Sequence, residues 1–165
     1  MLDNFQRRKD DTLSRLDKSS KKSWDEKISK LCEKINSLEN YYTTSSCSGR
    51  ILLMISLEKK QKDLFLKVHH DLVSLGELKK DLDNLDNKEL IKFKQEPPIL
   101  HIVCKDLESA QKMYDTAKLA GWKHCGIIAT GRRFVVELNC SGKIEFPIMK
   151  NGKVLVDTLK GTSDD

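Results

Sequence analysis

Long apolar runs are missing from this sequence. No hydrophobic stretch approaches the roughly 20 residues that a membrane-spanning helix needs, so no such helix is expected. The segment Met1–Asp10 is polar and charged, which is not typical of a secretory signal. With 38% hydrophobic and 33% charged residues, the 165-residue chain can bury a core. We therefore expect a single domain over residues 1–160 and a flexible tail at residues 161–165.

Paired cysteines are missing as well. The chain has five cysteines, an odd number, and no two of them stand at Cys-x-x-Cys spacing. This pattern argues against a zinc knuckle and against a framework of disulfides. The cysteine usage therefore predicts a reducing, cytoplasmic setting.

Three loops that many enzymes use for phosphate binding or nucleophilic catalysis are also absent. The sequence contains neither a Gly-x-x-x-x-Gly-Lys phosphate loop nor a Gly-x-Ser-x-Gly nucleophile elbow. No Gly-x-Gly-x-x-Gly stretch follows a predicted strand, so a Rossmann-type cofactor site has no support. An enzyme with this sequence therefore needs a less common scaffold.

The charge that is present is mildly basic and clustered. The formal net charge is +5 and the isoelectric point is near 8.9. Ordinary enzymes reach such values, so the total alone does not separate them from nucleic-acid-binding proteins. Basic residues gather in three places: Lys18, Lys21 and Lys22; Lys59, Lys60 and Lys62; and Arg132 with Arg133. Each cluster can be a solvated surface or a contact with phosphates.

The spacing of apolar residues predicts four helices. They cover approximately Leu2–Leu16, Trp24–Leu38, Leu75–Leu85 and Leu107–Ala117. Ser23-Trp-Asp-Glu26 reads as a capping box for the second helix. Asp106 is expected to cap the fourth helix, and Gly121 is expected at its C-terminal end.

Short apolar or alternating runs predict strands between these helices. The expected strands are Tyr41–Ser45, Ile51–Leu57, Asp63–Val68, Ile91–Gln95, Ile99–Cys104, Trp122–Ile128, Arg133–Asn139, Lys143–Met149 and Val154–Val156. Asn151-Gly152 predicts a hairpin between the last two. The fold class is therefore α+β, with a largely antiparallel sheet that curls towards a barrel. Ser48-Gly49-Arg50 and Thr130-Gly131-Arg132 form a short echo that suggests a duplicated unit.

The loop Thr43-Thr-Ser-Ser-Cys-Ser-Gly-Arg50 is the most informative stretch for chemistry. Hydroxyls and backbone amides crowd a short turn, a glycine permits close approach, and an arginine stands beside it. Such a loop can hold a carboxylate or a phosphate, because amides and hydroxyls donate and a guanidinium makes two parallel hydrogen bonds. The alternative is an ordinary polar turn.

Histidines and one carboxylate complete the candidates. His69 and His70 are adjacent at a predicted strand end, so their side chains point to opposite sides and do not form a metal site together. With no acidic partner at ligand spacing, no metal is expected. His70 and His101 are candidates for orienting a substrate or carrying a proton. Glu96 precedes two prolines and is a candidate for binding a cationic group, or an exposed carboxylate at a strand end.

Several blocks, taken in order, resemble one family. They are Thr43–Ile51, the strand that ends in His70, Phe93–Cys104, Ala120–Ile128 and Ile144–Pro147. Together they are similar to the tRNA wybutosine-synthesis methyltransferases, over roughly Asp17–Val156. The resemblance implies two related β/α halves around one curved, barrel-like sheet. It also implies transfer of a methyl group from S-adenosylmethionine to N4 of a wyosine-type modified guanine, next to the anticodon of phenylalanine tRNA.

The candidate residues follow from this resemblance together with the local patterns. His70 and Glu96 are the expected catalytic residues. Cofactor binding is expected from Ser45, Ser46, Ser48, Gly49, Arg50 and His101. Contacts with tRNA are expected from Lys21, Lys22, Lys60, Arg132 and Arg133. The expected partners are thus the cofactor and tRNA, without a membrane and without a metal.

The sequence also departs from the family. Val68-His69-His70 stands where members often have Lys-Trp-His, and Cys125-Gly126-Ile127 stands where Ser-Gly-Ile is usual. The usual C-terminal helical extension is absent or cut short after Leu159. These departures keep open a second interpretation, a noncatalytic RNA-binding paralogue with a decayed active site. A hydrolase that uses Ser46 or Cys47 is a third interpretation, but it has no recognisable partner motif.

Overall fold

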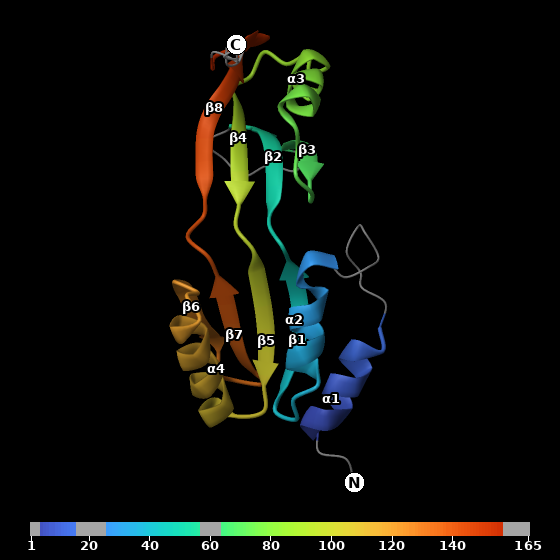
Figure 1. The fold of residues 1–165 in the computed structure, drawn as a ribbon, viewed down its shortest axis with the longest axis vertical. Coiled ribbons are helices and arrows are strands. Elements are labelled where there is room, and N and C mark those ends of the chain that lie inside the picture. Colours follow the sequence, from blue (N-terminus) through green and yellow to red (C-terminus); the bar gives the residue numbers. More distant parts are fainter. Residues whose placement is uncertain (1–3, 16–25, 57–63, 157–165) are drawn as a thin grey trace, which may run out of the picture. The chain divides into compact units, whose positions relative to one another are not determined.

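The computed structural model describes residues 4–15, 26–56 and 64–156. Its elements in chain order (Figure 1) are α1 (Asn4–Leu13), α2 (Glu26–Asn36), β1 (Tyr41–Cys47), β2 (Arg50–Ile55), β3 (Phe65–His69), α3 (Leu75–Asp83), β4 (Ile91–Glu96), β5 (Ile99–Cys104), α4 (Leu107–Leu119), β6 (His124–Ala129), β7 (Phe134–Asn139), β8 (Ile144–Lys150) and β9 (Lys153–Val154). None of the helices described has the length and the apolar character that a membrane crossing requires.

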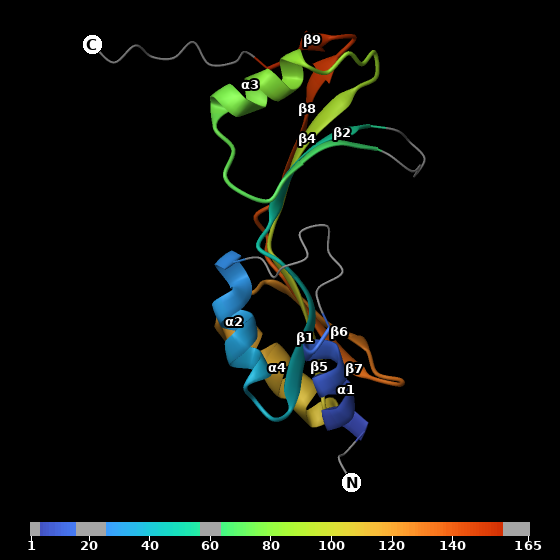
Figure 2. The same cartoon turned by 90° about the vertical axis from the view of Figure 1, so that its right-hand side faces the viewer.

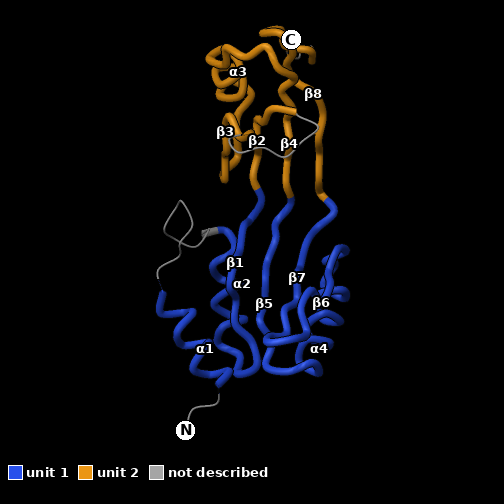
Figure 3. The backbone as a smooth tube through the Cα atoms, turned by 180° about the vertical axis from the view of Figure 1, so that it is seen from behind, with its two compact units in different colours: residues 1–49, 97–141 blue, residues 50–96, 142–165 orange. Residues whose placement is uncertain are grey.

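The chain forms two compact units, and each unit is assembled from two separate segments (Figure 3). Unit 1 contains residues 1–49 and 97–141, and unit 2 contains residues 50–96 and 142–165. The α+β class predicted from the sequence is confirmed, because both units combine helices with an antiparallel sheet.

Unit 1 is a four-stranded antiparallel sheet in the order β1-β5-β7-β6. Helices α2 and α4 cover one face of this sheet, and α1 lies on the other face (Figure 2). Strand alternation explains this arrangement, because successive side chains point to opposite faces. Tyr41 donates a hydrogen bond from its hydroxyl to the carbonyl of Ser109 in α4, while the ring of Tyr42 lies 5.3 Å from that of Phe5 in α1.

The core of unit 1 lies between the sheet and helices α2 and α4. Its buried members are Ile28, Cys32, Ile35, Tyr41, Leu100, Ile102, Cys104, Ala110, Ala117, Val136 and Leu138. Alternate residues of β5, from Leu100 to Cys104, belong to this core. The residues between them, such as His101, therefore point to the opposite face of the sheet.

Unit 2 is a five-stranded antiparallel sheet in the order β3-β2-β4-β8-β9. Helix α3 packs on one face, where its leucines meet apolar side chains of β2, β4 and β8. The buried members of this smaller core are Leu53, Leu82, Ile91, Ile148 and Met149. Ser74 and Glu77 form a reciprocal capping box that defines the start of α3.

The prediction of one curved, barrel-like sheet is wrong, because the described strands form two separate sheets that are not closed. Strands β1 and β2 follow one another in the chain but belong to different sheets, and so do β4 and β5. Between β4 and β5 lie Pro97 and Pro98, which have no N–H to donate to a ladder. Pairing therefore stops there, and each sheet keeps its own edges.

The suggested duplication is not found. Ser48 and Gly49 connect β1 of unit 1 to β2 of unit 2, whereas Thr130-Gly131-Arg132 lies in the turn of the β6–β7 hairpin within one sheet. The two units also differ in strand number and strand order. The three-residue echo is thus a similarity of turn composition rather than of fold.

Several local signals are confirmed. Asp106 caps α4 by accepting a hydrogen bond from the backbone N–H of Ser109, and Gly121 follows the helix with a φ of 95°. Asn151 and Gly152 have φ values of 50° and 71° and join β8 to β9 in a tight hairpin. The capping box at Ser23 lies outside the described residues.

Candidate active site

A row of three polar side chains crosses the sheet of unit 1. Ser45 in β1 is the register partner of His101 in β5, and His101 is the partner of Glu137 in β7. Because register partners project from the same face, the three side chains meet. Ser45 Oγ lies 2.9 Å from His101 Nδ1, and His101 Nε2 lies 2.8 Å from Glu137 Oε2. We call Ser45, His101 and Glu137 the cross-strand row.

The backbone explains why the row forms. The register between β1 and β5 shifts between Thr43 and Ser45, and this bulge changes which residues of β1 face each side. Thr43 consequently bonds to Asn36 of α2, whereas Ser45 reaches His101. The row lies on the face of the sheet opposite α2 and α4.

The row can accept and hold a proton. A neutral imidazole has one N–H donor and one acceptor nitrogen. If Nε2 donates to the Glu137 carboxylate, Nδ1 is the acceptor and the Ser45 hydroxyl donates to it. The side chains of His101 and Glu137 are 30% and 33% exposed, so the row is accessible to a reactant. A carboxylate beside the ring also stabilises the imidazolium that forms when Nδ1 takes up a proton.

A second cluster, the arginine cluster, lies in unit 2. It consists of Arg50 in β2 and of Lys94 and Glu96 in β4. Arg50 Nε lies 2.6 Å from Glu96 Oε2, and Lys94 Nζ lies 2.5 Å from Glu96 Oε1. The guanidinium carbon of Arg50 also lies 5.6 Å from the centroid of the Phe65 ring. One carboxylate is therefore shared by two cations, and the cluster keeps a net positive charge.

The protonation state of Glu96 follows from this pairing. Burial by itself raises the pKa of its carboxyl, because the charged form loses hydration. The hydrogen bonds and charges of Lys94 and Arg50 outweigh burial, and the pKa of Glu96 is lowered below its ordinary value. Glu96 is thus an ionised counter-ion at neutral pH, which suits positioning of Arg50 better than proton transfer.

The predicted polar loop is mostly strand. Strand β1 extends to Cys47, so only Ser48 and Gly49 connect it to β2. Gly49 has a φ of 106°, a conformation that favours glycine. Ser46 pairs with Leu100 in the register, and its hydroxyl partly offsets the effect of burial, which raises the pKa of the Cys32 thiol in α2. The side chains of Ser45 and Ser46 therefore point to opposite faces of the sheet.

The two adjacent histidines lie in unit 2. His69 ends β3, and its Nε2 lies 2.6 Å from Oδ2 of Asp81 in α3. His70 follows in a bend. The contact between His69 and Asp81 joins α3 to the sheet, and the local sequence did not predict it. The catalytic role of His70 stays a prediction.

The basic candidates divide into two groups. Arg132 and Arg133 are exposed in the turn between β6 and β7, where the carbonyl of Arg132 accepts a hydrogen bond from Arg8 of α1. The predicted tRNA contacts Lys21, Lys22 and Lys60 lie outside the described residues.

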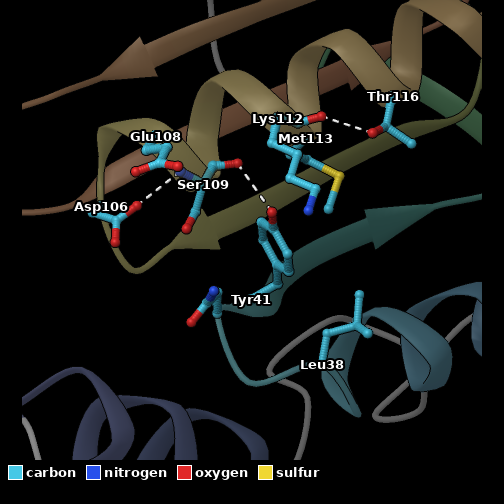
Figure 4. Close-up of a pocket in the computed structure, with 9 residues that line it drawn as sticks. Leu38, Tyr41, Asp106, Glu108, Ser109, Lys112, Met113 and Thr116 are labelled. Atoms are coloured by element: carbon cyan, nitrogen blue, oxygen red, sulfur yellow. Dashed lines mark hydrogen bonds between the residues drawn. The ribbon is translucent and has the colours of Figure 1, made fainter.

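A cavity of about 400 Å³ opens beside the N-terminal end of α4 (Figure 4). Its walls include Tyr41, Asp106 and Lys112, and no residue predicted from the sequence as functional lines it. Asp106 already caps α4, and the Tyr41 hydroxyl is bonded to Ser109, as the figure shows. These two polar groups thus stabilise the fold.

Glu137 is the main residue that sequence reasoning missed. It stands in an alternating strand with apolar residues on either side, which is also the pattern of an ordinary exposed glutamate. The only available signal was its position in a strand that pairs with the strand of His101, and that pairing is a property of the tertiary fold.

Comparisons with known proteins give the family. Residues 7–160 match the family described as "Methyltransferase TYW3". A Methanocaldococcus jannaschii protein named tRNA(Phe) 7-((3-amino-3-carboxypropyl)-4-demethylwyosine(37)-N(4))-methyltransferase is 39% identical, over 81% of this chain and 70% of its own length. A Danio rerio protein named tRNA wybutosine-synthesizing protein 3 homolog is 34% identical, over 93% of this chain and 63% of its own.

A solved structure agrees with the sequence matches. The PH1069 protein from Pyrococcus horikoshii superposes with a TM-score of 0.82 at 35% identity, and the match covers 93% of this chain and 79% of that one. The chain spans 65% of the length of the matching Pyrococcus furiosus methyltransferase and 63% of the Danio rerio relative. The family match covers well over half of the chain, and this protein therefore belongs to the TYW3 methyltransferase family.

Proposed function

We propose that this protein methylates N4 of a wyosine-type modified guanine in phenylalanine tRNA, with S-adenosylmethionine as the methyl donor. Family membership and the names of the archaeal relatives support the reaction and the tRNA. The observation that carries the proposal is the cross-strand row, because transfer of a methyl group to an N–H nitrogen releases one proton that needs an acceptor.

The row provides a path for that proton. As N4 of the base gains the methyl group it loses its proton to the Ser45 hydroxyl, which passes its own proton to Nδ1 of His101. The resulting imidazolium is stabilised by Glu137, whose carboxylate already lies 2.8 Å from Nε2. This assigns a proton-accepting role to His101, in place of the cofactor-binding role expected from the sequence.

The donor set of unit 2 fits an amino-acid ligand. S-adenosylmethionine, when bound, supplies a methyl group on a positively charged sulfur, and it carries an amino acid carboxylate. Arg50 is 34% exposed at its side chain and uses its Nε for Glu96. A guanidinium has further N–H donors in a planar fork that matches a carboxylate. We assign the carboxylate contact to Arg50 and the positioning of Arg50 to Glu96.

Arg132 and Arg133 support tRNA binding. Exposed cations release counterions from nucleic acid when they neutralise phosphates, so binding weakens steeply as salt rises. Binding of phenylalanine tRNA is expected to weaken between dilute and physiological salt, and Arg132→Gln with Arg133→Gln is expected to flatten that dependence by about one or two counterions. If the double variant binds tRNA with the wild-type dependence on salt concentration, these arginines do not contact the tRNA.

A single-turnover assay tests the function. The chain is mixed with S-adenosylmethionine labelled in its methyl group and with phenylalanine tRNA isolated before N4 methylation. Label is expected in the modified base, as identified by nuclease digestion and mass spectrometry. A chain that binds S-adenosylmethionine in calorimetry but labels no tRNA would refute the assigned reaction.

Arg50 offers a separate binding test. Arg50→Ala is expected to weaken S-adenosylmethionine binding by about 1.5–3 kcal/mol, the range for hydrogen bonds to charged groups, with a smaller effect on stability. Arg133→Ala serves as the matched control, because it removes an exposed arginine outside the arginine cluster. Equal affinities for wild type, Arg50→Ala and Arg133→Ala would take Arg50 out of the cofactor contact.

A further inference from the structure

We infer that one face of the unit 2 sheet is a binding surface for the single-stranded loop of an RNA, an inference that rests on the proposed function. The face carries Arg50, Leu52 and Met54 of β2, Phe65 and Val68 of β3, Lys92, Lys94 and Glu96 of β4, and Glu145 and Pro147 of β8, and of these Leu52 is fully buried. We call these residues the open face. The open face is thus the place on this chain where the RNA of the proposed reaction binds.

Strand alternation defines the open face. Leu53 and Ile91 belong to the core under α3, so the residues that alternate with them point away from that helix. The register then aligns the members in rows: Arg50 with Glu96, Leu52 with Lys94 and Val68, and Met54 with Lys92 and Phe65. Helix α3, the one helix among the described residues of unit 2, packs on the opposite face.

Large apolar side chains are exposed on this face. Phe65 is 52% exposed and Val68 is 40% exposed. An exposed aromatic ring lacks the favourable free energy of burial until a partner covers it, and an exposed apolar patch marks a binding site. The guanidinium of Arg50 lies 5.6 Å from the ring centroid of Phe65. Aromatic rings are surfaces on which unpaired bases stack, and Phe65 is the ring that this face offers.

The charge of the open face selects RNA over a protein partner. Arg50, Lys92 and Lys94 lie on the face, and Lys143 reaches it through Glu145 at 3.2 Å. Arg50 is assigned to the cofactor, and the three lysines still outnumber the two carboxylates, Glu96 and Glu145, so the surface keeps a positive charge. Protein–protein interfaces are depleted in lysine at their centres. Lysines interleaved with an exposed aromatic ring are typical of surfaces that follow an RNA backbone and stack its bases.

The test measures RNA binding by the full chain. The probe is a fluorescently labelled synthetic hairpin with the sequence of the anticodon stem-loop of phenylalanine tRNA, followed by anisotropy. Phe65→Ala is expected to weaken binding about tenfold, in line with the loss of one stacked base. Leu107→Ala is its matched control, since Leu107 is also 52% exposed but lies on α4 of unit 1. That control is expected to bind like wild type.

A lysine pair tests the charge of the face. Lys92 forms an ion pair with Glu145 and is 32% exposed, and Lys105 forms one with Glu39 in unit 1 and is 37% exposed. Lys92→Gln is expected to weaken binding several-fold and to lower the salt slope by about one, whereas Lys105→Gln leaves both unchanged. Far-ultraviolet circular dichroism and thermal melting establish that each variant is folded.

The outcomes separate this inference from the proposed function. If wild type methylates tRNA but Phe65→Ala and Lys92→Gln bind the hairpin like their controls, the open face is not the RNA surface and the methyltransferase assignment stands. If wild type binds the hairpin through these residues but transfers no methyl group, the RNA surface stands and the assigned reaction falls. Concentration-dependent dimerisation that Phe65→Ala abolishes without any change in hairpin affinity would overturn the RNA surface in favour of a second copy of the chain.

Discussion

The two units of this protein bury their sheets to different extents. In unit 1 helices lie on both faces of a four-stranded sheet, whereas in unit 2 one described helix lies on one face of a five-stranded sheet. Eleven buried residues form the core of unit 1 and five form that of unit 2, counted over the described residues. The larger core of unit 1 is therefore expected to hold its side chains in place. Unit 2 leaves one face of its sheet without a described helix.

The polar groups of the two units follow this difference. In unit 1 the cross-strand row uses neighbouring strands to hold three side chains in line, which fixes a histidine between a hydroxyl and a carboxylate. In unit 2 ion pairs lie on the open face, where two carboxylates are shared among several cations. Unit 1, with the larger core, is therefore suited to proton transfer, and unit 2 is suited to recognition of charge.

The largest expected effect is on catalysis by unit 1. His101→Ala should lower single-turnover methyl transfer by about 10²–10⁴-fold, the range for loss of a general base. Glu137→Gln should cause a smaller loss, because Glu137 acts through His101. A wild-type rate in His101→Ala would show that unit 1 does not supply the proton acceptor and that the units do not differ in this way. A loss of rate in His70→Ala, with its folding checked by thermal melting, would show that unit 2 also carries a proton acceptor.

Two matched isoleucines compare the cores. Ile102 in β5 of unit 1 and Ile91 in β4 of unit 2 are both 0% exposed. Each truncation to Ala is expected to lower the free energy of unfolding by about 2–5 kcal/mol, with the larger loss at Ile102 because helices on both faces limit collapse around the cavity. Urea denaturation measures both values. A larger loss at Ile91 would contradict the view that unit 1 is the more rigid one.

Cysteine reactivity reports on unit 1 alone, because all five cysteines lie in its two segments. Burial raises the pKa of the Cys104 thiol to about 12, so little reactive thiolate is present at neutral pH. Iodoacetamide should modify Cys104 in the native protein far more slowly than in urea. Ile102→Ala should accelerate that reaction, and Ile91→Ala should leave it nearly unchanged. Equal acceleration by the two variants would show that the units open together.

The smallest expected effect is the acid response of unit 2. The pKa of Glu96 is lowered in the folded chain, so its ionised form stabilises folding above the ordinary value of 4.5, and this contribution is lost as the pH falls through the lowered pKa. Glu96→Gln should therefore reduce the dependence of unfolding free energy on pH in the acid range, as measured by urea denaturation. A Glu96→Gln variant that keeps the wild-type dependence on pH would show that the arginine cluster does not stabilise the fold.

Local chemistry accounts for what could be predicted from the sequence. The cap at Asp106, the turn at Asn151-Gly152 and the α+β class depend on the preferences of a few neighbouring residues, and all three are found. The family was also recognisable, because its motifs are contiguous stretches such as Ser45–Arg50. The number of sheets was predicted wrongly, since pairing between strands distant in the sequence decides it.

The order of amino acids sets which chemical groups this protein has: the serines and arginine of Ser45–Arg50, the histidine at 101 and the carboxylate at 96. The partners of these groups depend on how the strands pair. Residues 45, 101 and 137 are brought together by strand register, and residues 50 and 96 by the ladder between β2 and β4. The physical reason is that a strand's side chains alternate between faces, so a single bulge or proline pair sets which side chains meet.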